Sequence, residues 1–512
     1  MTGFLRLAVV AAACSALGTW LCASAAADAP DPATLLAKHR AFVGWQLGDG
    51  AFRSLRLTGT LFDEQGKPTR LRTEWRLGLI YRKRSAFAEH PGDAEDEGFT
   101  GNLFWNSNVN GFTTPAYGDL AKYRLSYDLL ANEGTASLQA QPRGQATVDG
   151  TPCETLRLTV PDGDPIDVDV NESTGAYVRA TVDPGGTYER VIHILGYQEV
   201  LPGKRMVSAF RLGDSTETFR YSAIEPNAPV SESDLHPPAQ RAAWAFAQSA
   251  PFAVTVSPTR VIVNASVNGV KGRFILDTGA NGIFLNERFA DEAKLPKAGP
   301  SGAVLGLHGG LVADLRKADS LQIGGNTLSN VVVEAEDFNS NDPFGLDRSN
   351  YAGLLGYDIF AGAIVRLDFA AATMSIAGPD EDLPEPGGVA FPVDTSLGVP
   401  TVSMTLNRSI DVRAMLDTGD PAGVVFGPDI LYRYHLRMAR NIGVSLQYGS
   451  IECGNLDTLQ LGPITYAGEQ ACKLDSPLVA GKNVLVGLDF LRNFALLFDY
   501  PHGRIFFQKA RR

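Results

Sequence analysis

The segment Phe274-Ile275-Leu276-Asp277-Thr278-Gly279-Ala280 is an apolar stretch that ends in an acidic turn, and Ala414-Met415-Leu416-Asp417-Thr418-Gly419-Asp420 repeats it later in the chain. Three apolar residues before Asp-Thr-Gly are typical of a buried strand that delivers the Asp to a turn. The Thr offers a hydroxyl that can tie two turns together, and the Gly allows another backbone to approach closely. The repeat therefore predicts two carboxylates that face each other across one water molecule.

A second motif follows each acidic turn. Leu354-Leu355-Gly356 ends 79 positions after its Asp, and Leu485-Val486-Gly487 ends 70 positions after its own. In both copies another Asp lies 12 positions beyond that Gly, at Asp368 and at Asp499. A fixed order of matching elements with one change of internal length indicates a duplicated domain.

Asp-Thr-Gly-Ala followed by apolar-apolar-Gly resembles the retropepsin-like aspartic proteases, and the match covers about residues 252–510. The resemblance implies a mainly β fold with two tandem β-barrel domains that form a pepsin-like pseudo-dimer. It also implies that Asp277 and Asp417 form a catalytic dyad. Two carboxyl groups held about 3 Å apart cannot both ionise. They therefore share one proton, which belongs to the pair and not to either Asp.

The resemblance assigns supporting roles to the residues around each Asp. In this family the two Thr side chains interlock, and the apolar-apolar-Gly strand packs beside the acidic loop and holds it rigid. Support of the catalytic loops is therefore expected from Thr278, Gly279, Ala280, Thr418, Gly419, Leu354, Leu355, Gly356, Leu485, Val486 and Gly487.

A glycine-rich stretch lies at the family's flap position, where a hairpin covers the substrate and excludes water. Its expected flap and substrate residues are Gly306, His308, Gly309 and Gly310. An ordinary glycine hairpin with an idle loop His is the alternative. In the second copy the matching residues 444–450 contain few glycines, so the analogy to pepsin predicts a single working flap.

Asp420 departs from the family, which has Ala, Ser or Thr after the second Gly. A third carboxylate near the dyad would raise its proton affinity or bind a cation. Pro421 follows directly, so a different turn that points Asp420 outward is the other interpretation.

Two functions are consistent with these motifs. The first is an exported aspartic endopeptidase, which hydrolyses peptide bonds of a peptide or protein substrate with a water activated by the dyad and needs no cofactor. The second is a non-catalytic protein that binds peptides or lipoproteins with degenerate retropepsin-like domains, and Asp420 and the altered second flap favour it. An Asx turn that caps a hairpin would explain one Asp-Thr-Gly, but it explains two copies with matched downstream motifs poorly.

Composition limits the remaining alternatives. The 512 residues carry a formal net charge of −12 and no basic stripe with interleaved aromatic residues, which argues against a nucleic-acid partner. The 53 Gly and 30 Pro suit turn-rich β domains. Only seven His occur, and they are scattered without a Cys-x-x-Cys motif, so no metal site is expected.

The first 27 residues have the pattern of a bacterial secretory signal. Arg6 precedes an apolar run, and Ala25-Ala26-Ala27 ends it on small residues. Cleavage there predicts a soluble periplasmic or secreted chain, and an uncleaved membrane anchor is the alternative. An export compartment would allow a disulfide between Cys453 and Cys472, with two buried thiols as the alternative, whereas Cys153 is expected to be a free buried thiol.

The sequence predicts a separate curved-sheet domain of mixed α and β structure over residues 28–229. Its Gly98-x-x-Gly101-x-x-x-Trp105 turn and Asp149-Gly150-Thr151-Pro152 hairpin are similar to bacterial lipoprotein-carrier and lipoprotein-sorting domains. That resemblance implies an apolar cavity for acyl chains and hence a lipid or lipoprotein partner, while a plain scaffold is the alternative. The expected order continues with a linker and helix over 230–250, the first repeat over 251–379, a linker over 380–388 and the second repeat over 389–512.

Overall fold

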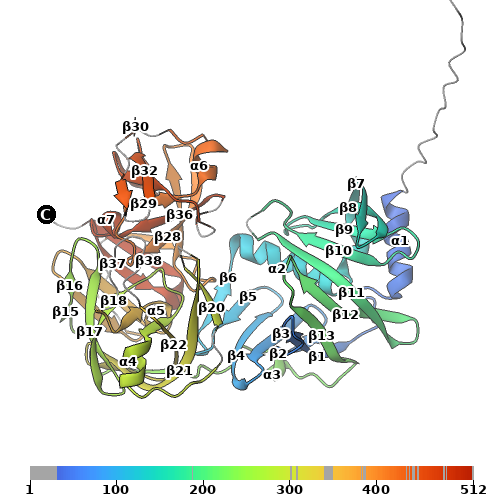
Figure 1. The fold of residues 1–512 in the computed structure, drawn as a ribbon, viewed down its shortest axis with the longest axis horizontal. Coiled ribbons are helices and arrows are strands. Elements are labelled where there is room, and N and C mark those ends of the chain that lie inside the picture. The colour runs from blue at the N-terminus through green and yellow to red at the C-terminus, as the bar shows by residue number, and fades with distance from the viewer. Residues whose placement is uncertain are drawn as a thin grey trace, which may run out of the picture.

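The structure, a computed structural model, describes residues 31–509 except 187, 300–301, 307–308, 339–349, 382, 384–387, 434, 438, 441–443, 447–448, 477–478 and 480. The signal sequence predicted over residues 1–27 and the flap residue His308 lie outside these described residues. Figure 1 shows an N-terminal unit (residues 31–229) beside a C-terminal part, in which a first half (residues 251–379) meets a second half (residues 389–509). The prediction of a mainly β fold is confirmed.

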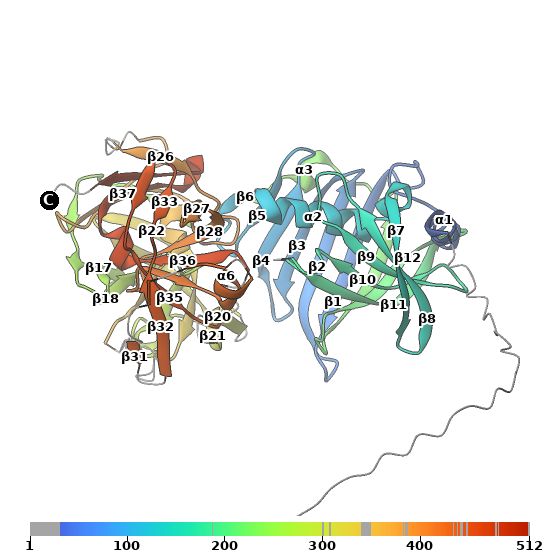
Figure 2. The ribbon, with the colours of Figure 1, turned by 90° about the horizontal axis from the view of Figure 1, so that it is seen from above.

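One antiparallel sheet of 13 strands forms the N-terminal unit and curves around its helices, as Figure 2 shows from above. Across the sheet the order runs from β6 back to β1, continues with β13 and ends at β7. Its helices are α1 (Pro32–Val43) and α2 (Gly118–Ala131). Its strands are β1 (Ser54–Phe62), β2 (Pro68–Leu77), β3 (Ile80–Phe87), β4 (His90–Phe99), β5 (Phe104–Ser107), β6 (Thr113–Ala116), β7 (Gln139–Val148), β8 (Thr151–Thr159), β9 (Ile166–Asn171), β10 (Tyr177–Val182), β11 (Arg190–Leu201), β12 (Lys204–Leu212) and β13 (Thr218–Pro226).

Charged side chains fill the space between α2 and strands β2 to β4. The buried Arg76 guanidinium donates to Asp128 of α2 and to Glu74 of its own strand. Beside it, Glu97 accepts from Lys83 at 2.7 Å and from Arg124 at 2.9 Å. Buried charges are tolerated when they are paired in this way. An apolar cluster that includes Tyr81, Phe104 and Leu120 lies between α2 and the same end of the sheet, so paired charges and apolar side chains occur together there.

The first half of the C-terminal part is built around a sheet in which β18 and β23 run in parallel. Three short strands lead into it: β14 (Ala243–Ala245), β15 (Phe252–Ala253) and β16 (Thr255–Val256). The half itself contains β17 (Val261–Val267), β18 (Val270–Leu276), β19 (Ile283–Asn286), α4 (Glu287–Glu292), β20 (Gly302–Gly306), β21 (Gly309–Ile323), β22 (Asn326–Glu336), β23 (Gly353–Leu355), α5 (Tyr357–Ala361), β24 (Ile364–Asp368) and β25 (Thr373–Ala377).

The second half repeats these pairings. Strand β28 runs parallel to β36, and β29 pairs with β36 in the antiparallel sense, as β18 and β19 do with β23. Its elements are β26 (Val389–Pro392), β27 (Thr401–Leu406), β28 (Ile410–Asp417), β29 (Val424–Phe426), α6 (Pro428–Tyr432), β30 (Ala439–Arg440), β31 (Val444–Leu446), β32 (Gly449–Asn455), β33 (Leu459–Leu461), β34 (Ile464–Tyr466), β35 (Gln470–Lys473), β36 (Asn483–Gly487), α7 (Leu488–Leu491), β37 (Phe494–Asp499) and β38 (Arg504–Lys509).

A shared sheet joins the two halves. Strand β24 of the first half pairs with β37 of the second, from Ile364 opposite Asp499 to Asp368 opposite Ala495. The six strands run in the order β15, β25, β24, β37, β38 and β26. Phe360 and Phe498 pack edge to face across this junction, with ring centroids 5.1 Å apart. Backbone pairing and a common apolar core therefore fix one half against the other.

Within the predicted linker and helix over residues 230–250, the later part contains a strand and no helix among its described residues. The linker contains a short helix earlier, α3 (Glu232–Leu235), and a strand at residues 243–245 that pairs with β22. Trp244 packs against the core of the first half and stacks on Phe246, with ring centroids 5.4 Å apart. An open sheet edge at β22 supplies backbone partners that an isolated short helix lacks, so pairing overrides the local pattern.

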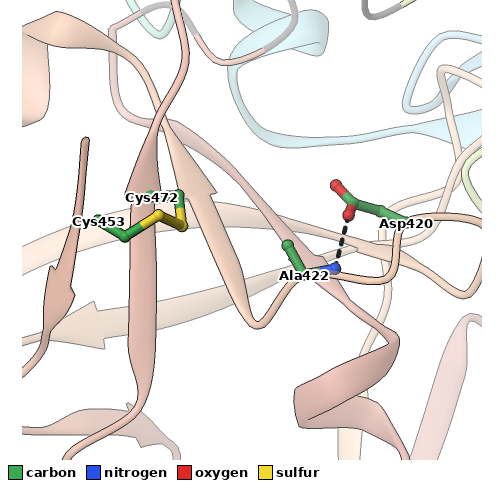
Figure 3. Close-up of a disulfide and its surroundings, with 4 residues drawn as sticks. All are labelled: Asp420, Ala422, Cys453 and Cys472. Carbon is green, nitrogen blue, oxygen red and sulfur yellow. Dashed lines mark hydrogen bonds between the residues drawn. A yellow bond between two sulfur atoms is a disulfide. The ribbon is translucent and has the colours of Figure 1, made fainter. Parts of the chain in front are cut away.

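The second half contains a disulfide between Cys453 of β32 and Cys472 of β35, which lie opposite each other in the pairing (Figure 3). Cys153 of β8 is a buried free cysteine. The bridge closes a loop with a sequence separation of 19 and so restricts the unfolded chain.

We expect the double replacement Cys453→Ala and Cys472→Ala to lower the free energy of unfolding by about 3 kcal/mol, because the unfolded chain regains the entropy of that loop. Urea unfolding of the oxidised protein measures the difference. Reductant should lower the stability of the native sequence and leave the double variant unchanged; a native protein insensitive to reductant would contradict the expectation.

Candidate functional site

The two Asp-Thr-Gly turns meet at the junction between the halves. Strand β18 ends at Leu276 and β28 ends at Asp417, and each is continued by its turn. Both strands lie in the middle of their sheets with completely buried apolar residues, Leu276 and Leu416, before the Asp. The apolar run thus fixes where each acidic turn emerges, as the sequence predicted.

Thr278 and Thr418 interlock through reciprocal hydrogen bonds. The Oγ1 of Thr278 donates to the carbonyl of Leu416 at 2.7 Å and accepts the N–H of Thr418 at 3.0 Å. The Oγ1 of Thr418 donates to the carbonyl of Leu276 at 2.7 Å and accepts the N–H of Thr278 at 3.1 Å. Both residues are almost completely buried, so no water competes for these bonds. The two turns are thereby held as one unit.

Each Gly lies against the carboxyl group of the opposite turn. A methyl group at Gly279 would lie 2.4 Å from Asp417 Cγ, and one at Gly419 would lie 2.4 Å from Asp277 Cγ. No side chain fits in that space, so only Gly allows the approach. Each Gly N–H also donates to the Asp of its own turn, at 3.0 Å for Asp277 and 2.7 Å for Asp417.

The carboxyl groups of Asp277 and Asp417 lie close together at the junction, since each one lies against the Gly of the opposite turn. Two carboxylates at such a position repel each other and have no donor for a hydrogen bond, so a proton on one of them favours the pair. Burial raises the pKa of Asp417 well above its usual value, and the negative charges of Asp277 and Asp420 raise it further. The pair therefore retains a proton to higher pH than an exposed Asp does.

The apolar-apolar-Gly motifs support the turns from behind. The N–H of Asp277 donates to the Leu355 carbonyl at 3.0 Å, and Asp417 lies opposite Gly487 in the parallel pairing. A methyl group at Gly356 would lie 2.3 Å from the Ala280 carbonyl oxygen, and one at Gly487 would lie 2.3 Å from that of Ala422. The Gly of each motif is required because the acidic loop packs directly on its backbone.

Asp420 lies in the same loop and has no counterpart in the first turn, where Ala280 stands. Its carboxylate accepts the N–H of Ala422 at 2.7 Å (Figure 3). Its own N–H donates to Asp417 at 3.2 Å. Burial raises the pKa of Asp420 to about 6 against the opposing effect of the Ala422 N–H, and the charge of Asp277 adds to the rise. Asp420 thus folds back on its own turn and still acts electrostatically on the pair.

Hairpins occur at the flap position in both halves. Strands β20 and β21 pair from Gly302 opposite Ala313 to Gly306 opposite Gly309, and Gly310 lies opposite Leu305. In the second half β31 pairs with β32, from Val444 opposite Ile451 to Leu446 opposite Gly449. Strand pairing in the second hairpin does not need the glycines that the first hairpin contains, and a single working flap stays a prediction.

Sequence reasoning missed Asp358, which follows Gly356 in α5 and is 2% exposed. Burial raises its pKa to about 6, opposed by hydrogen bonds from Asn108, Asn110 and the N–H of Ile283. A signal was present, because the second copy has Asp489 at the matching position. Only the tertiary structure reveals that the N-terminal unit covers one of these two Asp residues.

Two further features of the described residues concern metal binding and membrane-spanning helices. No group of three or more His, Cys, Asp or Glu side chains among them could hold a metal ion. None of the helices within the described ranges is both long and apolar enough to cross a membrane.

Comparison with known proteins supports the assignment of the first half. Residues 263–359 match the family described as aspartyl protease, a range that includes the first Asp-Thr-Gly turn and Leu354-Leu355-Gly356. The first half therefore has an aspartyl-protease-like domain, which points to hydrolase chemistry on peptides or proteins. The comparison with curated proteins gave no match.

Among solved structures, a DUF1329 family protein from Desulfovibrio piger is 15% identical to this chain. The match covers 40% of this chain and 97% of that protein, with a TM-score of 0.29. A likeness at that level carries no conclusion about this chain.

We expect Thr278→Ala to lower the free energy of unfolding by about 2–4 kcal/mol, because it leaves the Leu416 carbonyl and the Thr418 N–H buried without partners. Thr278→Ser retains the hydroxyl and should recover most of the loss. Chemical unfolding of both variants, with the exposed Thr465→Ala as control, provides the measurement. Equal losses for Ala and Ser would contradict a role for the hydroxyl.

Proposed function

We propose that this protein is an exported aspartic endopeptidase composed of two tandem retropepsin-like domains, with Asp277 and Asp417 as its catalytic dyad. The observation that carries the proposal is that the two turns interlock through Thr278 and Thr418, so that each Asp carboxyl group lies against the Gly of the opposite turn. An Asx turn that only caps a hairpin has no reason to place its Asp against an identical turn from elsewhere in the chain. The aspartyl protease match over residues 263–359 supports the same reading.

The chemistry follows from the shared proton. The unprotonated member of the dyad removes a proton from a water molecule, which attacks the scissile carbonyl carbon, while the protonated member donates to the carbonyl oxygen. A tetrahedral gem-diol forms without a covalent bond to the protein. Transfer of a proton to the leaving amine then breaks the C–N bond and regenerates the singly protonated dyad. Neither Asp suffices alone, and the Thr278–Thr418 interlock keeps the two in register.

The substrate is a peptide or protein segment bound in extended form beneath the β20–β21 hairpin, and the β31–β32 hairpin is a second element at the corresponding position. Action in the bacterial periplasm or outside the cell is part of the proposal and rests on the sequence of residues 1–27 and on the disulfide in the second half. A lipid or lipoprotein partner of the N-terminal unit remains a sequence-based prediction.

We expect Asp277→Asn and Asp417→Asn each to reduce cleavage of a peptide library by about 10³-fold or more, because half of the dyad cannot perform both proton transfers. Asp489→Asn is the matched control, since that Asp pairs with Arg492 at the surface of the second half. Cleavage is measured across pH by mass spectrometry. Activity that survives in either variant would exclude a mechanism in which Asp277 and Asp417 act together on one water molecule.

The same variants test for misfolding. A group whose folded pKa is raised binds its proton more tightly in the folded state, so its ionisation costs stability as the pH rises above its unfolded pKa. For Asp417 the folded pKa lies well above the ordinary 3.8. Asp417→Asn should therefore be more stable than the native protein at pH 7 and equally stable below about pH 3. If Asp417→Asn is inactive and yet more stable than the native protein at pH 7, the loss of activity comes from the missing carboxyl group and not from misfolding.

We expect Asp420→Asn to move the alkaline limit of activity to lower pH by about one unit, because a negative charge near the dyad favours its proton and Asn removes that charge. Asn keeps an oxygen that can accept the Ala422 N–H, so the turn is preserved. The measurement is kcat/KM against pH. A limit that stays in place or moves upward would show that Asp420 does not act on the dyad.

A further inference from the structure

The N-terminal unit extends a hairpin into the first half of the C-terminal part. Strands β5 and β6 form the end of the 13-stranded sheet that faces the C-terminal part in both Figure 1 and Figure 2. Phe112, in the loop between them, is 3% exposed and belongs to the apolar core of the C-terminal part. A methyl group at Gly362, just after α5, would lie 2.7 Å from the Phe112 ring. The hairpin tip is thus built into the other domain, not laid on its surface.

Asn108 organises this tip. Its side-chain oxygen accepts the N–H of Asn110 at 3.0 Å and of Phe112 at 3.1 Å, which closes the turn. Asn110 then anchors the tip, because its amide pairs with the N–H and the carbonyl of Val332 at 2.7 Å and 2.9 Å. The side-chain nitrogen of Asn108 remains, and it donates to Asp358 at 2.7 Å. An amide whose oxygen is fixed by two backbone donors has its nitrogen aimed in one direction.

Asp358 transmits this contact to the first acidic loop. It follows Tyr357, whose N–H donates to the Ala280 carbonyl at 2.9 Å. This bond holds the loop that starts at Asp277 just after its Asp-Thr-Gly turn. A methyl group at Gly282 would lie 3.7 Å from the Asp358 carboxylate, which places that carboxylate within the bend of the loop.

The second half provides an internal comparison. Asp489 occupies the matching position after Gly487, but its side chain is 42% exposed and pairs with Arg492 of its own helix. The duplicated Asp is therefore a surface residue where the N-terminal unit is absent and a buried carboxylate where that unit covers it. The contact belongs to the first loop alone.

We infer that Asn108 is a positioning residue: through Asp358, the N-terminal unit holds the Asp277 loop in the geometry that the dyad needs. Further contacts tie the same unit to the second half, since Asn106 donates to the Ser396 carbonyl at 2.9 Å and Arg413 donates to the Tyr188 hydroxyl at 3.1 Å. The N-terminal unit therefore spans both halves. The inference rests on the proposed function only in calling this loop catalytic.

A pair of reciprocal substitutions tests the contact. Asn108→Asp keeps the oxygen that closes the turn but places a carboxylate against Asp358, and Asp358→Asn removes the acceptor's charge. The double variant Asn108→Asp with Asp358→Asn restores a carboxylate–amide hydrogen bond in the opposite sense and preserves the net charge. It separates loss of the contact from loss of the fold.

Hydrogen exchange of the full-length protein, read by mass spectrometry, is the first readout. We expect exchange of residues 277–283 to rise about tenfold in each single variant and to return to the native rate in the double variant. Residues 416–423 of the second loop and the control Asp489→Asn should not change. Native exchange in both single variants, or a double variant that does not recover, would overturn the inference.

Peptide cleavage is the second readout. We expect kcat to fall about tenfold in each single variant while KM stays within about twofold, because misplacement of the loop affects the transition state more than substrate binding. The double variant should recover kcat. Unchanged kcat in the single variants would overturn the positioning role. If the native protein cleaves nothing, the proposed function fails, and hydrogen exchange still decides whether Asn108 holds the loop.

Discussion

The arrangement of this molecule depends on the reciprocal hydrogen bonds between Thr278 and Thr418. Burial and like charge would drive Asp277 and Asp417 apart if both were ionised. Four buried hydrogen bonds of about 1 kcal/mol each oppose that separation, and each would leave an unsatisfied partner if it broke. A shared proton removes one of the two charges, so the interlock needs to stabilise only one buried anion. The raised pKa of Asp417 is the consequence of this balance.

The two halves share a pairing scheme and differ in what supports it. In the first half Leu315 of β21, which also forms the flap-position hairpin, packs with Phe87 and Val109 of the N-terminal unit. In the second half the Cys453–Cys472 disulfide ties the hairpin strand β32 to β35. A docked domain and a covalent bridge thus hold equivalent strands. The chemistry is also asymmetric, because Asp420 adds a carboxylate to one loop only.

Sequence reasoning located the features that depend on local pattern. Apolar strands before Asp277 and Asp417, the supporting Gly356 and Gly487, and the helix and strands of the N-terminal unit all follow from residue type and spacing. It failed where a distant partner decides the outcome. Residues 243–245 form a strand because the edge of β22 is open. The burial of Asp358 could not be inferred, because Asp489 at the matching position follows a similar apolar-apolar-Gly motif and has a different environment.

These contacts bear on whether the N-terminal unit could be released as a pro-segment. Its removal would uncover the apolar site of Phe112 and leave Asp358 without the amide of Asn108. A buried side chain of that size contributes about 2–3 kcal/mol through the hydrophobic effect, and a buried carboxylate without its partners costs a similar amount or more. Arg241 adds further bonds across the same boundary, to the carbonyls of Gly92 and Ala94 at 2.8 Å and 2.6 Å. A segment meant to leave would need an interface that is stable without it. The N-terminal unit is therefore an integral part of the folded protein, and the geometry of the first acidic loop depends on its presence.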